Sequence, residues 1–234
     1  MNDNGSMFLL RWREATVLNT VIHGDCRSVL KTIPDESVHF VLTDPPYLIN
    51  YVDRSGRSIR NDRSRDDVLT VFSDLFRVLK PNSLCVSFYG WNHVERFATR
   101  WKAAGLRPVG HIVFWKNYAS GQRFLRYSHD CAYLLAKGQP DPPSNPISDL
   151  LRWHYSGNHF HPSEKAVETV KPIIEAFTKA GELVLDPFAG SGSTLVAAAL
   201  TGRQYIGIEL EQKYCDLARR RLSGVQRHLA PVTP

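Results

Sequence analysis

The sequence lacks several features that would set it apart from ordinary globular proteins. Its four cysteines, Cys26, Cys85, Cys131 and Cys215, are scattered without a CxxC pair, which argues against a zinc knuckle or a disulfide framework. No stretch approaches the roughly 20 apolar residues that a membrane-spanning helix needs. Residues 1–16 hold only one short apolar run, 8–10, with arginines directly after it. We therefore expect a soluble cytoplasmic protein with reduced thiols and no signal peptide.

The chain also lacks low-complexity segments and internal repeats. It has 234 residues, of which 43% are hydrophobic and 22% charged, the composition of a globular protein that folds throughout. This length predicts one domain over residues 1–234. Lys and Arg outnumber Asp and Glu by 29 to 23, a net charge of +6. That excess favours a polyanionic partner such as DNA, although many basic proteins bind no nucleic acid.

The pattern of apolar residues predicts alternating strands and helices. Strands are expected at 38–43, 84–88, 108–115, 131–136, 183–186 and 204–208, and helices at 67–79, 94–104, 163–180, from the glycine turn to 200, and 212–222. Ser163 is a candidate cap for the third helix, which would place Lys165 in its first turn. Such alternation predicts a mostly parallel sheet. Residues 48–66 and most of 118–160 do not follow it, and loops of that length commonly bind something or are disordered.

A glycine-rich turn links the strand at 183–186 to the next helix. There Gly190 and Gly192 would let the backbone approach a ligand and present amide donors at a helix N-terminus. Glu209 ends the following strand, where it could accept hydrogen bonds from two ribose hydroxyls. A tight turn beside a solvated glutamate is the alternative. Leu195 stands where a dinucleotide fold would have a third glycine, and Asp186 would repel a pyrophosphate but suit a cation. The pattern therefore favours S-adenosylmethionine over NAD.

The segment Asp44-Pro45-Pro46-Tyr47 follows the apolar run 38–43. An exocyclic amino group is a poor nucleophile because its lone pair is delocalised into the ring, so an enzyme must hold its N–H bonds and orient the pair. Asp44 offers a carboxylate and Pro45 a carbonyl, and the two prolines make the backbone rigid. Tyr47 offers a ring on which an extruded base could stack. A turn that ends a strand beside a buried tyrosine is the structural alternative.

With both segments present, the chain resembles the amino-group DNA methyltransferases of the β arrangement, in which D/S-P-P-Y/W precedes F-x-G-x-G. The resemblance runs from about residue 23 to 222. It implies a Rossmann-like fold of the S-adenosylmethionine-dependent methyltransferases, with helices on both faces of a mostly parallel sheet. It also implies methylation of adenine N6 in a flipped-out base of double-stranded DNA. Asp at the first motif position goes mostly with adenine, and Ser mostly with cytosine N4, the closest rival.

The resemblance assigns further residues to the cofactor. The segment at 161–165 is similar to H-P-T-x-K-P, with Ser163 replacing Thr and Ala166 replacing the last Pro. Asp25 and Cys26 would contact the cofactor's adenine, although Asp25 is equally a candidate helix cap. The expected cofactor residues are Asp25, Cys26, His161, Ser163, Lys165, Asp186, Phe188, Ala189, Gly190, Ser191, Gly192, Thr194 and Glu209. A DNA-binding homologue without activity, a nicotinamide oxidoreductase, and enzymes acting on RNA or glutamine remain rivals.

DNA contacts are expected in the two long loops. The loop at about 48–66 carries Arg54, Arg57, Arg60, Arg63 and Arg65, a density that suits phosphate contacts, although a solvated mobile loop would look the same. Arg123 and Arg126 lie in the region at about 117–160 that, by resemblance, recognises the target. His154, His159 and His161 cluster there, but no Cys or carboxylate completes a zinc ligand set, so we expect no metal. Members of the family are often homodimers, and we expect a dimer here.

Overall fold

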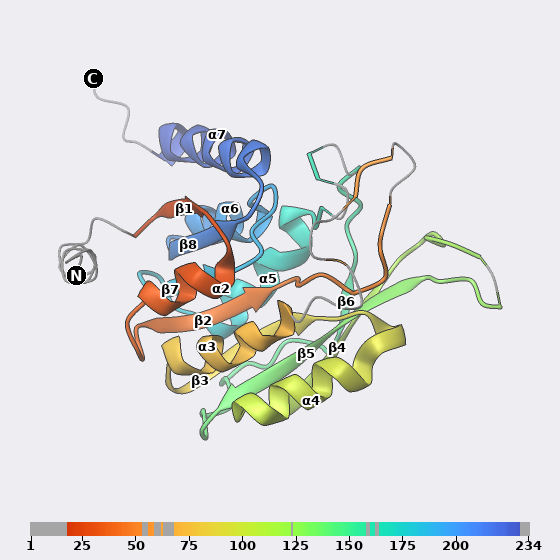
Figure 1. The fold of residues 1–234 in the computed structure, drawn as a ribbon, viewed down its shortest axis with the longest axis horizontal. Coiled ribbons are helices and arrows are strands. Elements are labelled where there is room, and N and C mark those ends of the chain that lie inside the picture. Colours follow the sequence, from red (N-terminus) through yellow and green to blue (C-terminus); the bar gives the residue numbers. More distant parts are fainter. Residues whose placement is uncertain are drawn as a thin grey trace.

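The computed structural model describes residues 18–52, 56–58, 62, 68–122, 124–157, 160–161 and 164–229. Within these ranges eight strands form one sheet in the order β1-β8-β7-β2-β3-β5-β4-β6 (Figure 1). Their bounds are β1 Thr20–His23, β2 Val38–Thr43, β3 Leu79–Phe88, β4 Arg107–Trp115, β5 His129–Lys137, β6 Leu150–Arg152, β7 Leu183–Asp186 and β8 Gln204–Glu209. Only β5 runs antiparallel to its neighbours, β3 and β4, among these strands. The expected mostly parallel sheet is confirmed.

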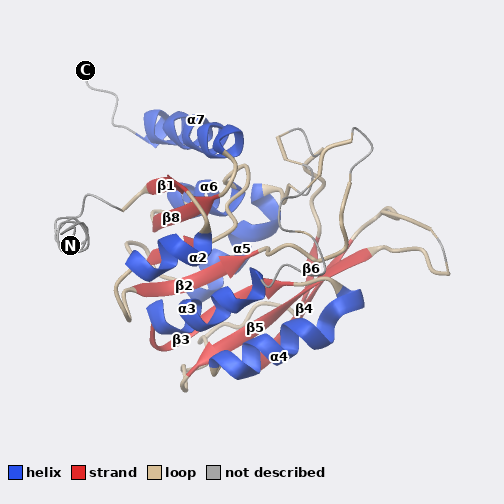
Figure 2. Ribbon diagram, in the orientation of Figure 1, coloured by secondary structure: helices blue, strands red, loops and turns tan. Residues whose placement is uncertain are grey.

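Helices cover both faces of the sheet, which gives three layers (Figures 1 and 2). The helices are α2 Cys26–Val29, α3 Val71–Val78, α4 Val94–Ala104, α5 Val167–Phe177, α6 Ser193–Leu200 and α7 Gln212–Leu229. Side chains from α2, α3 and α4 share one buried cluster with Val41 of β2, while those from α5, α6 and α7 share the other with Phe40 and Leu42. Successive residues of a strand point to opposite faces, so one strand supplies both cores.

The helix with the clearest local signals was predicted correctly. Helix α4 spans Val94–Ala104, and Gly105 follows it in the left-handed region at φ 91°, a common way for a helix to end. The strand after α3 was predicted less well, because β3 begins at Leu79 rather than at 84. The Lys-Pro-Asn sequence at 80–82, between the predicted helix and the predicted strand, lies at an irregularity of the β2–β3 ladder.

The predicted helix at 163–180 was wrong at both ends. Helix α5 spans only Val167–Phe177, and its N-cap is Ala166, whose backbone is extended and which makes no side-chain cap bond. Lys165 therefore precedes the helix and does not lie in its first turn. Ser163, our candidate cap, lies outside the described residues. The last helix extends to Leu229 instead of 222, and β6, a three-residue strand that pairs with β4, was not predicted.

The carboxyl ends of the parallel strands lie at one edge of the sheet. The loops after β2 and β7 and the segment that joins β4 to β5 begin at the same edge (Figure 1). Among the residues that the structure describes, none of the helices combines the length and the apolar character needed to cross a bilayer.

Candidate active site

Three neighbouring parallel strands end in acidic residues at this edge. Glu209 is the last residue of β8 and Asp186 the last of β7, and Asp44 directly follows the end of β2. These three strands are neighbours in the sheet. All three carboxylates line one cavity of about 860 Å³. The carboxyl edge of a parallel sheet is where ligands bind in open α/β folds, so the sheet itself brings together the two sequence segments that lie about 140 residues apart.

Most of the residues that we expected to act together line this cavity. They are Asp25, Cys26, Asp44, Pro45, Pro46, Tyr47, His161, Lys165, Asp186, Phe188, Ala189, Gly190, Ser191, Thr194 and Glu209. Gly192 is not part of the lining, and Ser163 lies outside the described residues. The structure thus gathers segments from five regions of the sequence around one cavity.

Both carboxylate oxygens of Asp44 accept a hydrogen bond. The Tyr47 hydroxyl donates to Oδ1 at 2.8 Å, and the Lys165 ammonium donates to Oδ2 at 2.5 Å. Burial, followed by the charge of Asp44, raises the pKa of Tyr47 well above its usual range. The phenol therefore keeps its proton and remains a donor at neutral pH. This hydrogen bond fixes the carboxylate that we expect to receive the substrate's amino group.

Two residues that the sequence did not reveal hold the segment around Tyr47 in place. Asp62 is 1% exposed, and its carboxylate accepts from the backbone N–H groups of Leu48 at 2.6 Å and Tyr51 at 2.6 Å. Gly90, just after β3, is tight against Tyr47, because a Cβ there would lie 2.8 Å from the Tyr47 Cβ. The sequence offered a signal for Asp62, the one acid between Arg54 and Arg65, but not for its buried position, and nothing in the sequence singled out Gly90.

Glu209 is oriented by the backbone around it. Its Oε2 accepts from Gly190 N at 2.9 Å and its Oε1 from Glu211 N at 2.7 Å. Burial raises the pKa of this carboxyl. A carboxylate oxygen has a second lone pair, so Glu209 can still accept bonds from a ligand's hydroxyls. The bond to Gly190 also ties the glycine turn to the end of β8.

Asp186 is the most strongly perturbed carboxyl of the cavity. Burial raises its pKa to about 7, bonds from Thr194 and Phe188 oppose that rise, and the charges of Asp44 and Glu209 add to it. A cation placed beside Asp186 would favour its ionised form. Apolar side chains, including Phe188 and Ile208, also line the cavity. Buried carboxylates beside apolar side chains fit a nucleoside with a cationic amino-acid end, which is the chemistry of S-adenosylmethionine.

The structure confirms that Asp25 caps a helix, and it is compatible with the predicted contact between Asp25 and the cofactor's adenine. Its side chain accepts from the Arg27 backbone N–H at the start of α2 and pairs with the Arg27 guanidinium at 2.5 Å. These bonds lower the pKa of Asp25. Asp25 and Cys26 also line the cavity, so contact with a bound cofactor remains a prediction beside the cap.

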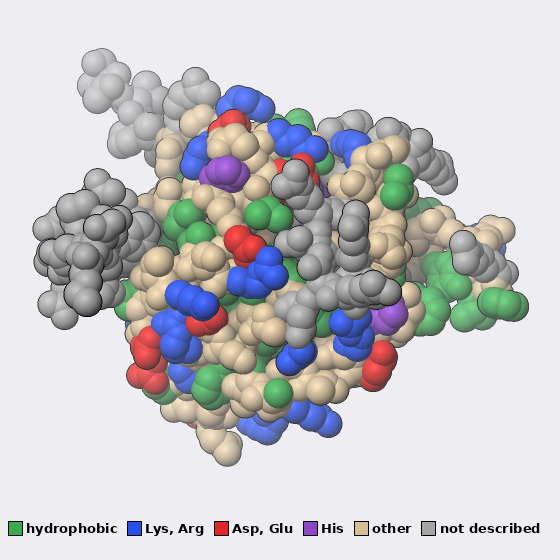
Figure 3. Space-filling view, in the orientation of Figure 1, with side chains coloured by type: hydrophobic (Ala, Val, Ile, Leu, Met, Phe, Trp, Pro, Cys, Tyr) green, Lys and Arg blue, Asp and Glu red, His purple; other side chains and the backbone are tan. Residues whose placement is uncertain are grey.

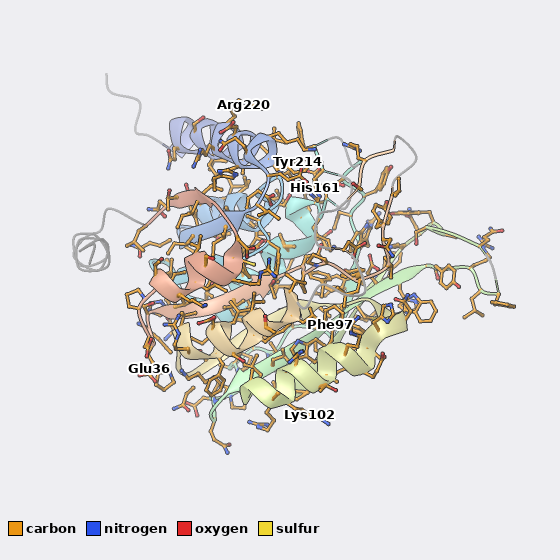
Figure 4. All side chains as sticks on the ribbon, in the orientation of Figure 1. Glu36, Phe97, Lys102, His161, Tyr214 and Arg220 are labelled. Carbon is orange, nitrogen blue, oxygen red and sulfur yellow. The ribbon has the colours of Figure 1, made fainter. Side chains whose placement is uncertain are left out.

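His161 and Gly192 both lie against helix α7 and show how the glycine turn packs. The His161 ring meets the Tyr214 ring of α7 edge-on, with centroids 4.4 Å apart, and the two residues are labelled close together in Figure 4. Burial lowers the pKa of His161 to about 4, so the imidazole is neutral at pH 7. A Cβ at Gly192 would lie 2.8 Å from the Cβ of Ala218, and its φ is +83°. Gly192 thus allows α7 to approach closely.

A buried ion pair, also missed from the sequence, joins α7 to the glycine turn. The Arg221 guanidinium lies 3.2 Å from Glu164 Oε1 and donates to the Ser191 carbonyl at 2.7 Å and the Ser191 hydroxyl at 2.9 Å. The Glu164 side chain is 4% exposed. Arg221 belongs to a run of three arginines, and sequence alone could not show which of them turns inward.

The residues proposed for DNA contact are only partly described. Arg57 lines the cavity and Arg126 is exposed, while Arg54, Arg60, Arg63, Arg65 and Arg123 lie outside the described residues. Exposed apolar side chains gather on the projection between β4 and β5, at the right of Figure 3. The cavity lining also contains aromatic residues, including Trp91, Tyr118 and Tyr155. In the described ranges, no three His, Cys, Asp or Glu side chains gather as metal ligands would.

Known proteins with similar sequences are methylases. A family model for DNA methylases matches residues 38–220. YubD of Escherichia coli (strain K12), described as a methylase, is 50% identical over 210 residues, which cover 90% of this chain and 92% of YubD. YhdJ of the same strain, a DNA adenine methyltransferase, is 30% identical over 253 residues, covering 90% of this chain and 85% of YhdJ.

Solved methyltransferase structures share the fold. The complex of M1.HpyAVI with S-adenosylmethionine aligns with a TM-score of 0.69 at 23% identity, over 87% of this chain and 98% of the other. The cytosine-N4-specific PvuII DNA methyltransferase aligns with a TM-score of 0.71 at 18% identity, over 88% and 89% of the two chains. A cytosine-N4-specific enzyme therefore shares this arrangement of strands and helices, so the fold alone does not decide which base is methylated.

Proposed function

Because the chain belongs to the DNA methylase family, we propose that it transfers a methyl group from S-adenosylmethionine to N6 of adenine in double-stranded DNA. The observation that carries this proposal is the single cavity in which Asp44 meets Asp186 and Glu209. Asp44 would hold an amino group, and Asp186 and Glu209 would hold a nucleoside with a cationic end. The segment Asp44-Pro45-Pro46-Tyr47 thus stands beside the glycine turn, as the chemistry requires.

The residues have separate tasks in the proposed reaction. Asp186, Glu209 and the Gly190 turn would hold the cofactor, which supplies an electrophilic methyl group on a sulfonium sulfur. Asp44 would accept a hydrogen bond from one N–H of the adenine amino group and the Pro45 carbonyl from the other, so that the nitrogen becomes pyramidal and its lone pair is no longer delocalised into the ring. Tyr47 holds Asp44 through its hydroxyl. The target base must leave the duplex to reach this cavity.

Adenine is favoured by the Asp at the first motif position and by the 30% identity to the adenine methyltransferase YhdJ. Cytosine N4 is the second candidate, since the PvuII enzyme of that specificity has the same fold and its amino group needs the same acceptors. The exposed Arg126 and the cavity residue Arg57 support a nucleic acid as substrate.

The test is transfer of labelled methyl from S-adenosylmethionine to unmethylated bacterial genomic DNA, with the modified nucleoside identified by mass spectrometry. We expect N6-methyladenine from the wild-type protein and none from Asp44→Ala. Product formed as N4-methylcytosine would favour the second candidate. Absence of transfer to DNA by a wild-type protein that binds the cofactor would reject the DNA substrate.

A further inference from the structure

Lys165 occupies the place at Asp44 that a substrate amino group needs. Its Nζ lies 2.5 Å from Asp44 Oδ2, and its side chain is 11% exposed. Three aromatic rings surround the ammonium, with centroids 4.7 Å away in Phe88, 5.5 Å in Trp153 and 5.8 Å in Tyr47. A cation in such surroundings is held by its anion and by the ring faces. The ammonium is itself an N–H donor, so it makes the contacts expected of the target base.

This position conflicts with the proposed reaction. The Tyr47 hydroxyl already donates to Asp44 Oδ1, so Lys165 takes the other oxygen. An ammonium binds a carboxylate more strongly than a neutral amino group does, and its charge would oppose a sulfonium brought to the same place. Each Asp44 oxygen keeps a second lone pair, but the ammonium competes with the base for Oδ2, so we expect Asp44 to hold the base for attack better once Lys165 has moved away.

The cavity offers Lys165 a second position. The preceding residue, Glu164, contacts Ser191 of the glycine turn, with the Ser191 hydroxyl 3.3 Å from Oε1. Lys165 thus lies between the glycine turn and Asp44, on a four-carbon side chain that is easily redirected. Acidic side chains outnumber basic ones in the described lining, and Lys116 is paired with Asp130 at 3.0 Å. The carboxylate of an amino-acid ligand at the turn would find its cation in Lys165.

We propose that Lys165 couples the two halves of the cavity: without cofactor it neutralises Asp44, and the cofactor's carboxylate draws it away, so that Asp44 accepts the target amino group only when the methyl donor is present. This inference rests on the proposed function. Lys165 then acts as a positioning residue for Asp44 as well as a cofactor ligand, and cofactor and base bind cooperatively.

A double-mutant cycle on cofactor binding tests the coupling without DNA. Affinity for S-adenosylhomocysteine, which has the carboxylate but no sulfonium, is measured by calorimetry for wild type, Asp44→Asn, Lys165→Gln and the double variant. Asp44→Asn removes the competitor for Lys165, so we expect it to bind about fivefold more tightly than wild type. The same change in the Lys165→Gln background should have no effect. Lys116→Gln is the matched control, since Asp44→Asn should still tighten binding there.

DNA binding supplies the second measurement. S-adenosylhomocysteine should tighten binding of genomic DNA fragments to the wild-type protein, whereas 5′-methylthioadenosine, which lacks the carboxylate, should not. In Lys165→Gln the two nucleosides should give equal DNA affinities. Circular dichroism confirms that each variant is folded.

The outcomes separate the two proposals. Asp44→Asn that binds S-adenosylhomocysteine no better than wild type, or a gain that persists with Lys165→Gln, overturns the coupling whatever the methyl-transfer assay shows. A wild-type protein that gives the expected cycle but does not methylate DNA keeps the Lys165 contact and rejects the DNA substrate. A wild-type protein that does not bind S-adenosylhomocysteine rejects both.

Discussion

At the scale of single residues, burial and hydrogen-bond partners together decide the pKa values of the acidic groups in the cavity. Asp25 and Asp186 both line it, yet their pKa values shift in opposite directions. The Arg27 guanidinium keeps the pKa of Asp25 below its usual range, whereas burial raises that of Asp186 to about 7. Near neutral pH, Asp25 is therefore ionised, and Asp186 is divided between its two forms.

This difference predicts a pH-dependent cofactor affinity. A cationic ligand favours ionised Asp186, so its binding releases a proton below pH 7 and becomes tighter as the pH rises. We expect affinity for S-adenosylmethionine to increase about tenfold from pH 6 to pH 8, measured by calorimetry. Asp186→Asn should bind weakly with no such slope, while Asp25→Asn should keep the slope. A slope unchanged in Asp186→Asn would assign the titration to another group.

At the scale of elements, α7 packs on the sheet and also holds the glycine turn in place. Arg221 reaches from this helix to the Ser191 carbonyl and hydroxyl and pairs with Glu164, while Gly192 lets Ala218 of the same helix approach the turn. The conformation of the glycine turn thus depends on a helix that follows it by some twenty residues. Glu164 in turn precedes Lys165, so the same ion pair positions the lysine beside Asp44.

Breaking this pair should destabilise the protein. Glu164→Ala leaves the Arg221 guanidinium buried without its anion, which we expect to lower the free energy of unfolding by about 3 kcal/mol. The double variant Glu164→Ala with Arg221→Met should lose less than the sum of the two single changes, because neither charge is left alone. Urea unfolding measures both effects. Exposed Lys171 and Glu175, an i,i+4 pair at 3.9 Å, provide the control, with less than about 1 kcal/mol expected. Additive losses would mean that the two residues act separately.

Local signals explain which elements could be predicted. Helix α4 has helical spacing and a left-handed Gly105 at its end, so its bounds follow from nearby residues. The start of α5 does not, because Glu164, just before it, is held by contacts with Ser191 and Arg221, which are distant in sequence. The segments that we propose for catalysis and cofactor binding were recognisable from their own residue types. The contact between Lys165 and Asp44 spans 121 positions and has no local signal.

At the scale of the whole molecule, the projection between β4 and β5 extends beyond the sheet (Figure 1). Its two arms stay paired past the strands, with Ser120 N donating to Tyr127 O at 2.8 Å. At its tip Phe124 is 99% exposed and Leu125 70%. Trp91, a cavity residue, stacks on Tyr127 with ring centroids 6.0 Å apart. The projection is therefore joined to the cavity by stacked rings.

Under the proposed function the cavity would receive an extruded base, and exposed apolar side chains beside it would suit contact with nucleic-acid bases. We expect the double change Phe124→Ser, Leu125→Ser to raise the KM for DNA about tenfold and to leave affinity for S-adenosylhomocysteine unchanged. Leu200→Ser alters a similarly apolar exposed residue at the end of α6, outside the cavity lining, and should change neither. Equal effects from both variants, or a KM that stays at the wild-type value, would mean that the tip does not contact DNA and that recognition depends on the charged loops alone.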